Sequence, residues 1–216
     1  MTTIAAIYPV LGLRITAGPL ELRGISDDDI AALADLAGRG VHPPEEMPFS
    51  VPWTDTPAVE LPLRFATYHW SLRASFSPEA WTLDLAAVWD GVVVGTQGFR
   101  TSNYLVSRTG ETGSWLGREH QGQGIGTRMR QAMCAFLFDC LDAQEISSGA
   151  FVDNPASLAV SRKVGYRPNG QRRIVRRPGE WQVNLALVLM PETFIRGVPI
   201  SVEGLEPVRR LIGLEG

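Results

Sequence analysis

Three glycines, Gly122, Gly124 and Gly126, stand directly before a stretch whose apolar residues recur with helical spacing. From Met129 these residues follow one another every three or four positions, which predicts an amphipathic helix that begins at or just after the glycines. The first N–H groups of a helix have no partner inside it, and glycine lets a ligand come close to the backbone. Because these groups also lie at the positive end of the helix dipole, the stretch predicts an anion site suited to phosphate.

The residues around the glycines help to decide which phosphate-binding motif this is. A P-loop needs lysine and then serine or threonine after its last glycine, but Gly126 is followed by Thr127 and Arg128. A dinucleotide-binding loop needs a third glycine where Thr127 stands. The spacing Q-x-x-G-x-G of Gln121, Gly124 and Gly126 is instead similar to the pyrophosphate-binding loop of the GCN5-related N-acetyltransferases, which bind acyl-coenzyme A.

Two further motifs carry the same resemblance. The segment G-S-W-L at 113–116 resembles a strand of the branch that contains the ribosomal-protein N-terminal acetyltransferases. Asn154 and Ser157, followed by K-V-G-Y at 163–166, resemble the N-x-x-S and K-x-G-[FY] signature of that branch. The three motifs stand in the expected order and cover about residues 111–189, so the chain is identified as similar to this family.

The resemblance implies a set of contacts with acyl-coenzyme A as co-substrate. The glycine loop would hold the pyrophosphate, the end of the preceding strand would pair its backbone with the pantetheine arm, and Asn154 would hydrogen-bond that arm. The implied contacts are Trp115, Leu116, Gly117, Gln121, Gly122, Gln123, Gly124, Ile125, Gly126, Thr127, Asn154 and Ser157.

The resemblance also suggests catalytic residues. Ser157 is the predicted acid that protonates the leaving thiolate, although Ser161 occupies the position where many relatives keep a tyrosine. Glu111 is the first candidate for the general base, followed by Glu46 and Asp55, and a water relay is an alternative to a direct base. The histidines and cysteines show no metal-ligand spacing, so we expect no metal.

The implied fold is an α+β GCN5-related fold, with a central mixed, mostly antiparallel, splayed sheet flanked by helices. The glycine loop would lie beside the splayed strands, where the pantetheine arm inserts. Apolar periodicity and turn residues predict strands at 13–16, 20–23, 81–89, 92–99, 111–116, 145–152, 166–175 and 181–189, and helices from 27 to 38 or 40, over 58–76, from the glycine loop to about 141, and from 155 to 165.

We expect one domain over 1–216, with a core at about 11–190 and a C-terminal extension at 191–216 that holds a strand at 198–202 and a short helix at 207–211. The second predicted helix, 58–76, has an apolar stripe of Leu61, Leu63, Ala66, Trp70 and Leu72. The arginines of the last hairpin, at 172, 173, 176 and 177, are expected on a solvated face, with an anionic ligand as the alternative.

Composition excludes several classes of function. Twenty lysines and arginines against 23 aspartates and glutamates give a formal charge of -3, which argues against a nucleic-acid-binding protein. The N-terminal stretch lacks the features of a secretory signal or a membrane span. Cys134 and Cys140, six residues apart on one predicted helix, face different directions, which is typical of a reducing, cytoplasmic setting. A homodimer is left open.

Segment 41–56 contains four prolines and cannot form regular structure. It either lines the acceptor side of the site or only fastens Phe49 and Trp53 to the core.

We expect transfer of an acetyl group from acetyl-coenzyme A to an amine by direct attack, with a small-molecule amine, a protein N-terminus or a lysine as acceptor. The alternatives are a succinyl-coenzyme A-dependent enzyme, in which His42, Ser50 or Thr54 binds the terminal carboxylate, and a non-catalytic acyl-coenzyme A sensor.

Overall fold

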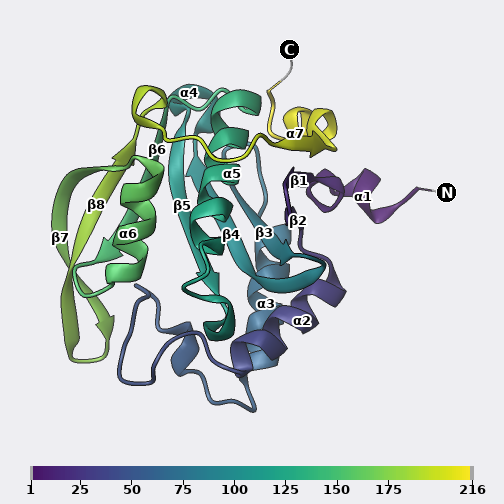
Figure 1. Cartoon of the computed structure of the whole chain (residues 1–216). Helices are drawn as coiled ribbons and strands as arrows, with labels where there is room; N and C mark the ends of the chain where they lie inside the picture. The colour runs from purple at the N-terminus through teal and green to yellow at the C-terminus, as the bar shows by residue number, and fades with distance from the viewer. Residues whose placement is uncertain (1, 215–216) are drawn as a thin grey trace.

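The computed structural model describes residues 2–214, and its centre is a nine-stranded sheet in the order β7-β8-β6-β5-β4-β3-β2-β1-β9 (Figure 1). All neighbouring strands run antiparallel except β5 and β6, which run parallel. The predicted mixed, mostly antiparallel sheet is therefore confirmed.

The strands alternate with helices along the chain. The strands are β1 Arg14–Ala17, β2 Leu20–Gly24, β3 Ala80–Trp89, β4 Val92–Ser102, β5 Thr109–Leu116, β6 Glu145–Phe151, β7 Arg167–Arg177, β8 Glu180–Leu189 and β9 Ser201–Glu203. The α-helices are α1 Ile4–Ile7, α2 Asp27–Gly38, α3 Leu61–Ala74, α4 Tyr104–Ser107, α5 Ile125–Cys140, α6 Pro155–Val164 and α7 Leu205–Leu211. Short 3-10 turns are η1 Pro9–Gly12, η2 Trp53–Asp55, η3 Arg118–His120 and η4 Pro191–Thr193.

Two layers of helices cover the sheet. Helices α5 and α6 lie on one face, and α2 and α3 lie on the other (Figure 1). The larger apolar core includes the inner side of α5, where Met129, Met133 and Phe136 are fully buried. A smaller core joins α2 and α3 to the opposite face through Leu33 and Phe65. Burial of these side chains is the main stabilising term of the fold.

Local signals set the ends of helices α2 and α6. Ser26 and Asp29 form a capping box at the start of α2. The Asn154 side chain caps α6, Pro155 takes the first helical position, and Gly165 ends the helix at a positive φ of 104°. Both helices therefore begin and end within about a residue of the predicted positions.

The parallel strands β5 and β6 separate part-way along their length. Their register runs from Thr109 opposite Glu145 to Thr112 opposite Ser148, and β5 continues to Leu116 beyond the last pair. Strand β4 still pairs with that end of β5, from Gly95 opposite Leu116 onward. The sheet is therefore splayed, and the end of β5 has a free edge toward β6.

The predicted stripe of the second helix is confirmed at Leu61 and Ala66 but is wrong at Leu63 and Trp70. Helix α3 buries Leu61, Phe65 and His69, whereas Leu63 is 69% exposed and Trp70 is 47% exposed. Apolar residues lie on more than one side of this helix, so the periodicity alone did not select a face. The face is selected by Phe65, whose ring packs 6.0 Å from Trp53 and 6.1 Å from Trp115, centroid to centroid.

Segment 100–110 differs from the expectation, whereas the C-terminal extension agrees with it. Segment 100–110, expected as a loop, contains the end of β4 and the one-turn helix α4, so Glu111 is the third residue of β5 and not its first. The C-terminal extension adds β9, which pairs antiparallel with β1 at the sheet edge, followed by α7. The predicted C-terminal strand and helix are both present.

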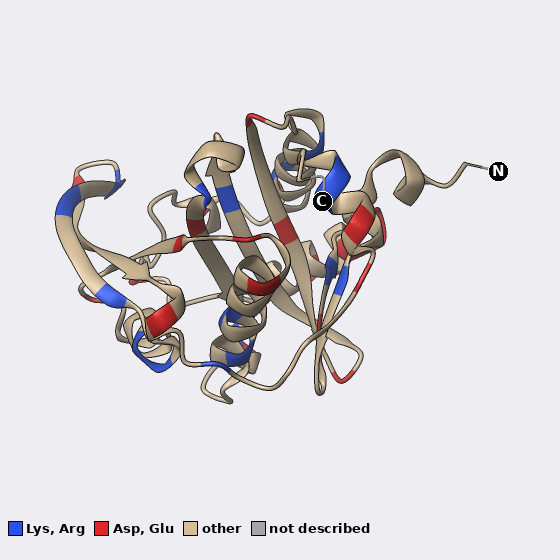
Figure 2. Ribbon diagram, turned by 90° about the horizontal axis from the view of Figure 1, so that it is seen from above, with Lys and Arg blue, Asp and Glu red and all other residues tan. Residues whose placement is uncertain are grey.

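Charges are mixed over the molecule. Figure 2 shows lysines and arginines interspersed with aspartates and glutamates along the ribbon, in keeping with the small net charge. None of the helices within residues 2–214 is long and apolar enough to cross a membrane.

Candidate active site

The glycine loop has the backbone that an anion site needs. Gly122 has a φ of +75° and Gly124 a φ of +83°, both in the left-handed region that favours glycine. Gly124 is the N-cap of the 16-residue helix α5 and offers no side-chain cap. Ile125, 1% exposed, anchors the start of that helix in the core. The first N–H groups of α5 therefore stand uncapped, at the positive end of a long helix dipole.

The glutamines of the loop hold its shape. The Gln121 side chain donates to the carbonyl oxygens of Val41, at 2.7 Å, and Leu116, at 2.9 Å. Gln123 donates to the Glu119 carbonyl at 3.0 Å. The side-chain amide of Gln121 thus positions the loop, and the backbone of the loop is the part that is left for a phosphate.

The end of β5 lies beside this loop. Leu116 is the last residue of the strand, and the Gly117 N–H donates to the Val94 carbonyl at 2.9 Å. A Cβ on Gly117 would lie 2.4 Å from the Leu36 side chain, so α2 packs directly against this turn. Trp115 points to the α3 face, where its ring lies 5.5 Å from that of Trp53.

The parallel arrangement of β5 and β6 brings the predicted motifs to one end of the sheet. The glycine loop follows β5 and the turn at Asn154 follows β6, so both lie where the two strands separate. The helices that start there touch, because a Cβ on Gly126 would lie 3.7 Å from the Val160 side chain. Loop, free strand edge and α6 start therefore surround one gap.

The two candidate serines differ in their surroundings. The Ser157 N–H donates to Asn154 Oδ1 at 3.0 Å, and its partly exposed hydroxyl forms no hydrogen bond within residues 2–214. Ser161, one turn further along α6, is 2% exposed, and its hydroxyl is buried without a partner among those residues. Only the Ser157 hydroxyl is both free and accessible from solvent.

Glu111 lies on β5 one residue before Thr112, the last residue of that strand that pairs with β6. It pairs with Arg100 at 3.1 Å and lines an open cleft of about 660 Å³ on the α3 side of the sheet, together with Thr82 and Glu145. Along β5 it precedes Trp115 by four residues, which is about 13 Å of extended chain. The structure thus places Glu111 in the cleft on the α3 face, where its carboxylate is paired with Arg100.

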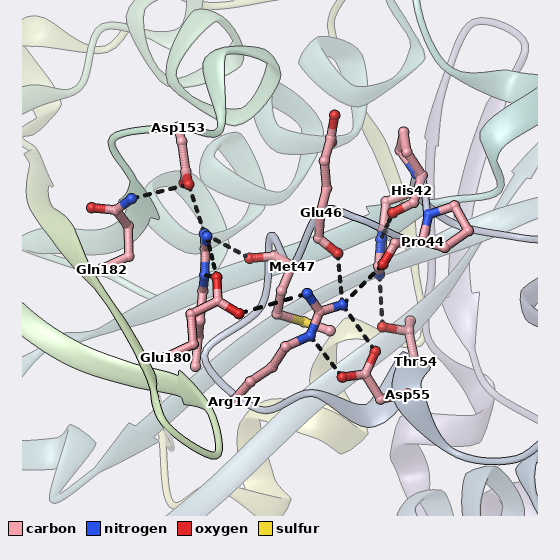
Figure 3. Close-up of polar contacts among 12 residues, drawn as sticks. His42, Pro44, Glu46, Met47, Thr54, Asp55, Asp153, Arg177, Glu180 and Gln182 are labelled. Carbon is pink, nitrogen blue, oxygen red and sulfur yellow. Dashed lines mark hydrogen bonds and ion pairs between the residues drawn. The ribbon is translucent and has the colours of Figure 1, made fainter.

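Two arginines fasten segment 41–56 to the β7–β8 hairpin (Figure 3). Arg177 donates to the Asp55 carboxylate at 2.8 Å and to the carbonyls of Pro44 and Glu46. This pairing holds the pKa of Asp55 below its usual value. Arg176, only 11% exposed, donates to the Met47 carbonyl at 3.3 Å and pairs with Asp153 and Glu180. We expected Arg176 and Arg177 on a solvated face, and this prediction is wrong. Segment 41–56, which is far away in the sequence, provides hydrogen-bond partners for both side chains.

The remaining contacts of this segment fasten it to itself and to β5. His42 Nε2 lies 2.7 Å from the Thr54 hydroxyl, and its Nδ1 lies 2.8 Å from the Pro43 carbonyl (Figure 3). Phe49 packs 5.3 Å from Trp53, which packs on Trp115 of β5. The loop is therefore fastened to the core beside the end of β5.

Two polar side chains near the splayed strands, those of Arg130 and Asp84, were not predicted from the sequence as functional residues. Arg130 of α5 is 4% exposed and donates to Ser114 of β5 and Ser148 of β6, each at 3.0 Å. It forms no ion pair within the described residues, so a buried positive charge lies under the point where the strands separate. Asp84 of β3 is the second such group, with His69 of α3 at 3.7 Å. Neither belongs to a short motif, so spacing along the chain gave no signal for them.

The part of the chain that the structure describes holds no cluster of three or more histidine, cysteine, aspartate or glutamate side chains placed to bind a metal.

Comparison with known proteins agrees with this geometry. Residues 19–167 match the family described as acetyltransferase (GNAT) domain. The Bacillus subtilis (strain 168) protein YdaF, whose name assigns it provisionally to the ribosomal N-acetyltransferases, is 26% identical over 91 residues. That match covers 42% of this chain and 49% of YdaF, so it spans about half the length of the curated relative.

Solved structures share the fold. Mycobacterium smegmatis RimJ, in complex with CoA-disulfide, superposes with a TM-score of 0.66 at 22% identity and covers 84% of this chain and 86% of that one. RimL, a ribosomal L7/L12 alpha-N-protein acetyltransferase in complex with coenzyme A, gives a TM-score of 0.64 at 18% identity, over 81% of this chain and 95% of that one. Because the sequence identities are 22% and 18%, the similarity to these two structures establishes the fold of this chain and no more.

Proposed function

This chain belongs to the acetyltransferase (GNAT) domain family, and from that premise we propose that it transfers the acyl group of an acyl-coenzyme A to an amine. The observation that carries the proposal is the pairing of an uncapped helix start with a free strand edge at one gap. The helix start suits a pyrophosphate, and the strand edge suits the amide groups of pantetheine. Both are needed to hold one extended co-substrate.

The reaction that fits the site is direct attack of the amine on the thioester carbon. A C–N bond forms, the C–S bond breaks, and the departing thiolate takes a proton from the Ser157 hydroxyl. The proton that the new amide nitrogen loses then restores the serine hydroxyl. N–H groups on the edge of β5 that faces away from β4, beyond its last pair with β6, polarise the carbonyl. Arg130 adds positive charge below the place where negative charge develops, and its burial makes that charge more effective.

The relatives support the choice of substrates. The RimJ and RimL structures are described as complexes of CoA-disulfide and of coenzyme A, and the RimL description names an alpha-N-protein acetyltransferase. A protein or peptide N-terminus is therefore the first acceptor class to test here, with lysine and small-molecule amines next. Acetyl is the first donor.

A panel of acceptors tests the proposal. The panel contains a seryl tripeptide, Nα-acetyl-lysine amide, spermidine and an aminoglycoside, and the readout is thiol release from acetyl-coenzyme A above the rate without acceptor. We expect at least one amine to give acceptor-dependent release, with the acetylated amine seen by mass spectrometry. Tight coenzyme A binding with no release for any amine would instead favour a non-catalytic sensor.

The acyl donor gives a separate prediction. Two of the three candidate ligands for a succinyl carboxylate, His42 and Thr54, already bond each other at 2.7 Å. A succinyl carboxylate would have to replace that bond, at a cost of about 1 kcal/mol. We expect kcat/KM for acetyl-coenzyme A to exceed that for succinyl-coenzyme A, measured with the same amine. A preference for succinyl that is lost in Thr54→Val would show that the pair opens to bind the carboxylate.

A further inference from the structure

A row of three residues crosses the sheet on its α3 face. Asp84 of β3 lies opposite Gly98 of β4, and Gly98 lies opposite Gly113 of β5. Residues opposite each other in a sheet point to the same face, and neighbouring strands lie about 4.8 Å apart. Gly113 is the first residue of β5 beyond the last pair with β6. The row therefore extends from the Asp84 carboxylate to the place on β5 where β5 and β6 separate.

The two glycines leave this row without side chains. A Cβ on Gly98 would lie 3.3 Å from Asp84 Oδ1, so the carboxylate leans over Gly98 toward β5. A Cβ on Gly113 would meet nothing within 4 Å, so the space above it is open. The backbone therefore forms the floor of a short trough between Asp84 and the gap that the thioester would enter.

Asp84 lacks a strong cation partner. Its side chain is 13% exposed, and its one ion-pair neighbour within residues 2–214 is His69, whose Nδ1 lies 3.7 Å away. Burial lowers the pKa of His69 to about 4, with a further contribution from Arg73, so this ring is neutral near pH 7. Burial raises the pKa of Asp84 to about 7, against the hydrogen bond from Thr96.

The other charged and titratable groups around Asp84 are already engaged or remain neutral. Arg73 of α3 donates to Asp27 and to the Ile25 carbonyl, each at 2.7 Å. Tyr68 of α3 keeps its proton, because burial raises its pKa to about 12. Tyr8 lines a cavity of about 20 Å³ beside Asp84, and burial raises its pKa to about 12 as well. That cavity has room for about one water molecule.

We propose that Asp84 binds the ammonium group of the acceptor and removes its proton before the amine attacks the thioester. The proposal rests on the proposed acyl transfer and adds the residue that activates the acceptor. The body of the acceptor would lie in the cleft of about 660 Å³, which shares Leu72 and Thr82 with the cavity beside Asp84. Glu111 also lines the cleft but is held by Arg100, so it competes less well for a cation.

Asp84 and Ser157 take part in separate proton transfers. The ammonium gives its first proton to the Asp84 carboxylate, and the neutral amine attacks the carbonyl carbon. As the C–S bond breaks, Ser157 protonates the sulfur, and the proton that the new amide nitrogen sheds returns to the serine oxygen. Asp84 then releases its proton to water through the adjacent cavity. A base whose pKa lies near neutrality serves this step best.

The variant Asp84→Asn tests whether the carboxylate acts in catalysis, because asparagine keeps the size of the side chain but cannot accept the proton of the ammonium group. At pH 7.5, with the fastest amine of the panel, we expect kcat/KM to fall about 10²- to 10⁴-fold while coenzyme A affinity stays within about twofold. Glu111→Gln is the competing variant, and we expect it to cause a smaller loss. A larger loss in Glu111→Gln than in Asp84→Asn would overturn the assignment, and so would an Asp84→Asn enzyme with wild-type kcat/KM.

Stability provides a readout that needs no acceptor. Between about pH 4 and 7 the folded protein keeps the Asp84 proton that the unfolded chain has lost, so this group makes the free energy of unfolding fall as pH rises through that window. At pH 8 we expect Asp84→Asn to raise Tm by at least about 2 °C, since a buried carboxylate is removed. A fall in Tm at pH 8 would indicate a structural role and would contradict the proposal.

The wild-type pH profile tests the same assignment without any variant. We expect kcat/KM to rise with pH through about 7, after correction for ionisation of the amine itself. A profile with no such limb would overturn the role of Asp84 even if Asp84→Asn failed to fold. If the wild-type protein acylates none of the amines, the proposed function fails first, and this inference fails with it.

Discussion

Replacing Ser157 by alanine is expected to lower kcat about ten- to a thousand-fold while changing coenzyme A affinity little. The hydroxyl gives its proton only when thiolate character develops, so its loss affects the transition state more than ground-state binding. Alanine keeps the backbone N–H that donates to Asn154 Oδ1, so the cap of α6 remains intact. The measurement is kcat by thiol release, with the coenzyme A Kd obtained by calorimetry.

Ser161→Ala is the matched control on the same helix. The Ser161 hydroxyl is buried without a partner within the described residues, so its removal leaves no group unsatisfied. We expect turnover close to that of the wild-type protein. If Ser161→Ala is inactive and Ser157→Ala is normal, the branch of the family to which the chain was likened is wrong. If neither variant loses activity, solvent protonates the sulfur.

Local chemistry made much of the fold predictable. The capping box at Ser26, the cap at Asn154 and the hairpin turn at Asp90 and Gly91 each satisfy or bend the backbone within a few residues. The element boundaries that they specify agree with the structure to within a few residues. The glycine loop was found for the same reason, since its geometry depends on consecutive residues.

Contacts between distant segments were not predictable in this way. Arg177 and Asp55 are 122 positions apart, and nothing in either neighbourhood indicates the pair. Asp84 reads as one polar residue in a strand that is otherwise half-buried, and it becomes a candidate only when Gly98 and Gly113 line up beside it. Arg130 likewise looks like a surface residue of an amphipathic helix until the two strands that it bridges are known.

Gly124→Val is expected to abolish the stabilisation that coenzyme A gives. Saturation at about 100 times Kd stabilises the native state by about 2.7 kcal/mol, which for a chain of this size raises Tm by about 5–10 °C. A branched side chain at the N-cap of α5 would occupy the space where the first N–H groups meet a pyrophosphate. Loss of one or two hydrogen bonds to a charged group would raise Kd about a hundredfold or more. Thermal unfolding with and without coenzyme A measures the effect.

Gly91→Val controls for the backbone strain of that substitution. Gly91 and Gly124 share a φ of +83°, and an added Cβ would meet nothing within 4 Å at either position. Valine therefore costs each site a similar strain, about 1–3 kcal/mol, and both variants should melt lower without ligand. Because Gly91 lies in the β3–β4 turn, outside the glycine loop, its variant should keep the full shift with coenzyme A. A folded Gly124→Val protein that also keeps the shift would show that the loop does not bind the pyrophosphate.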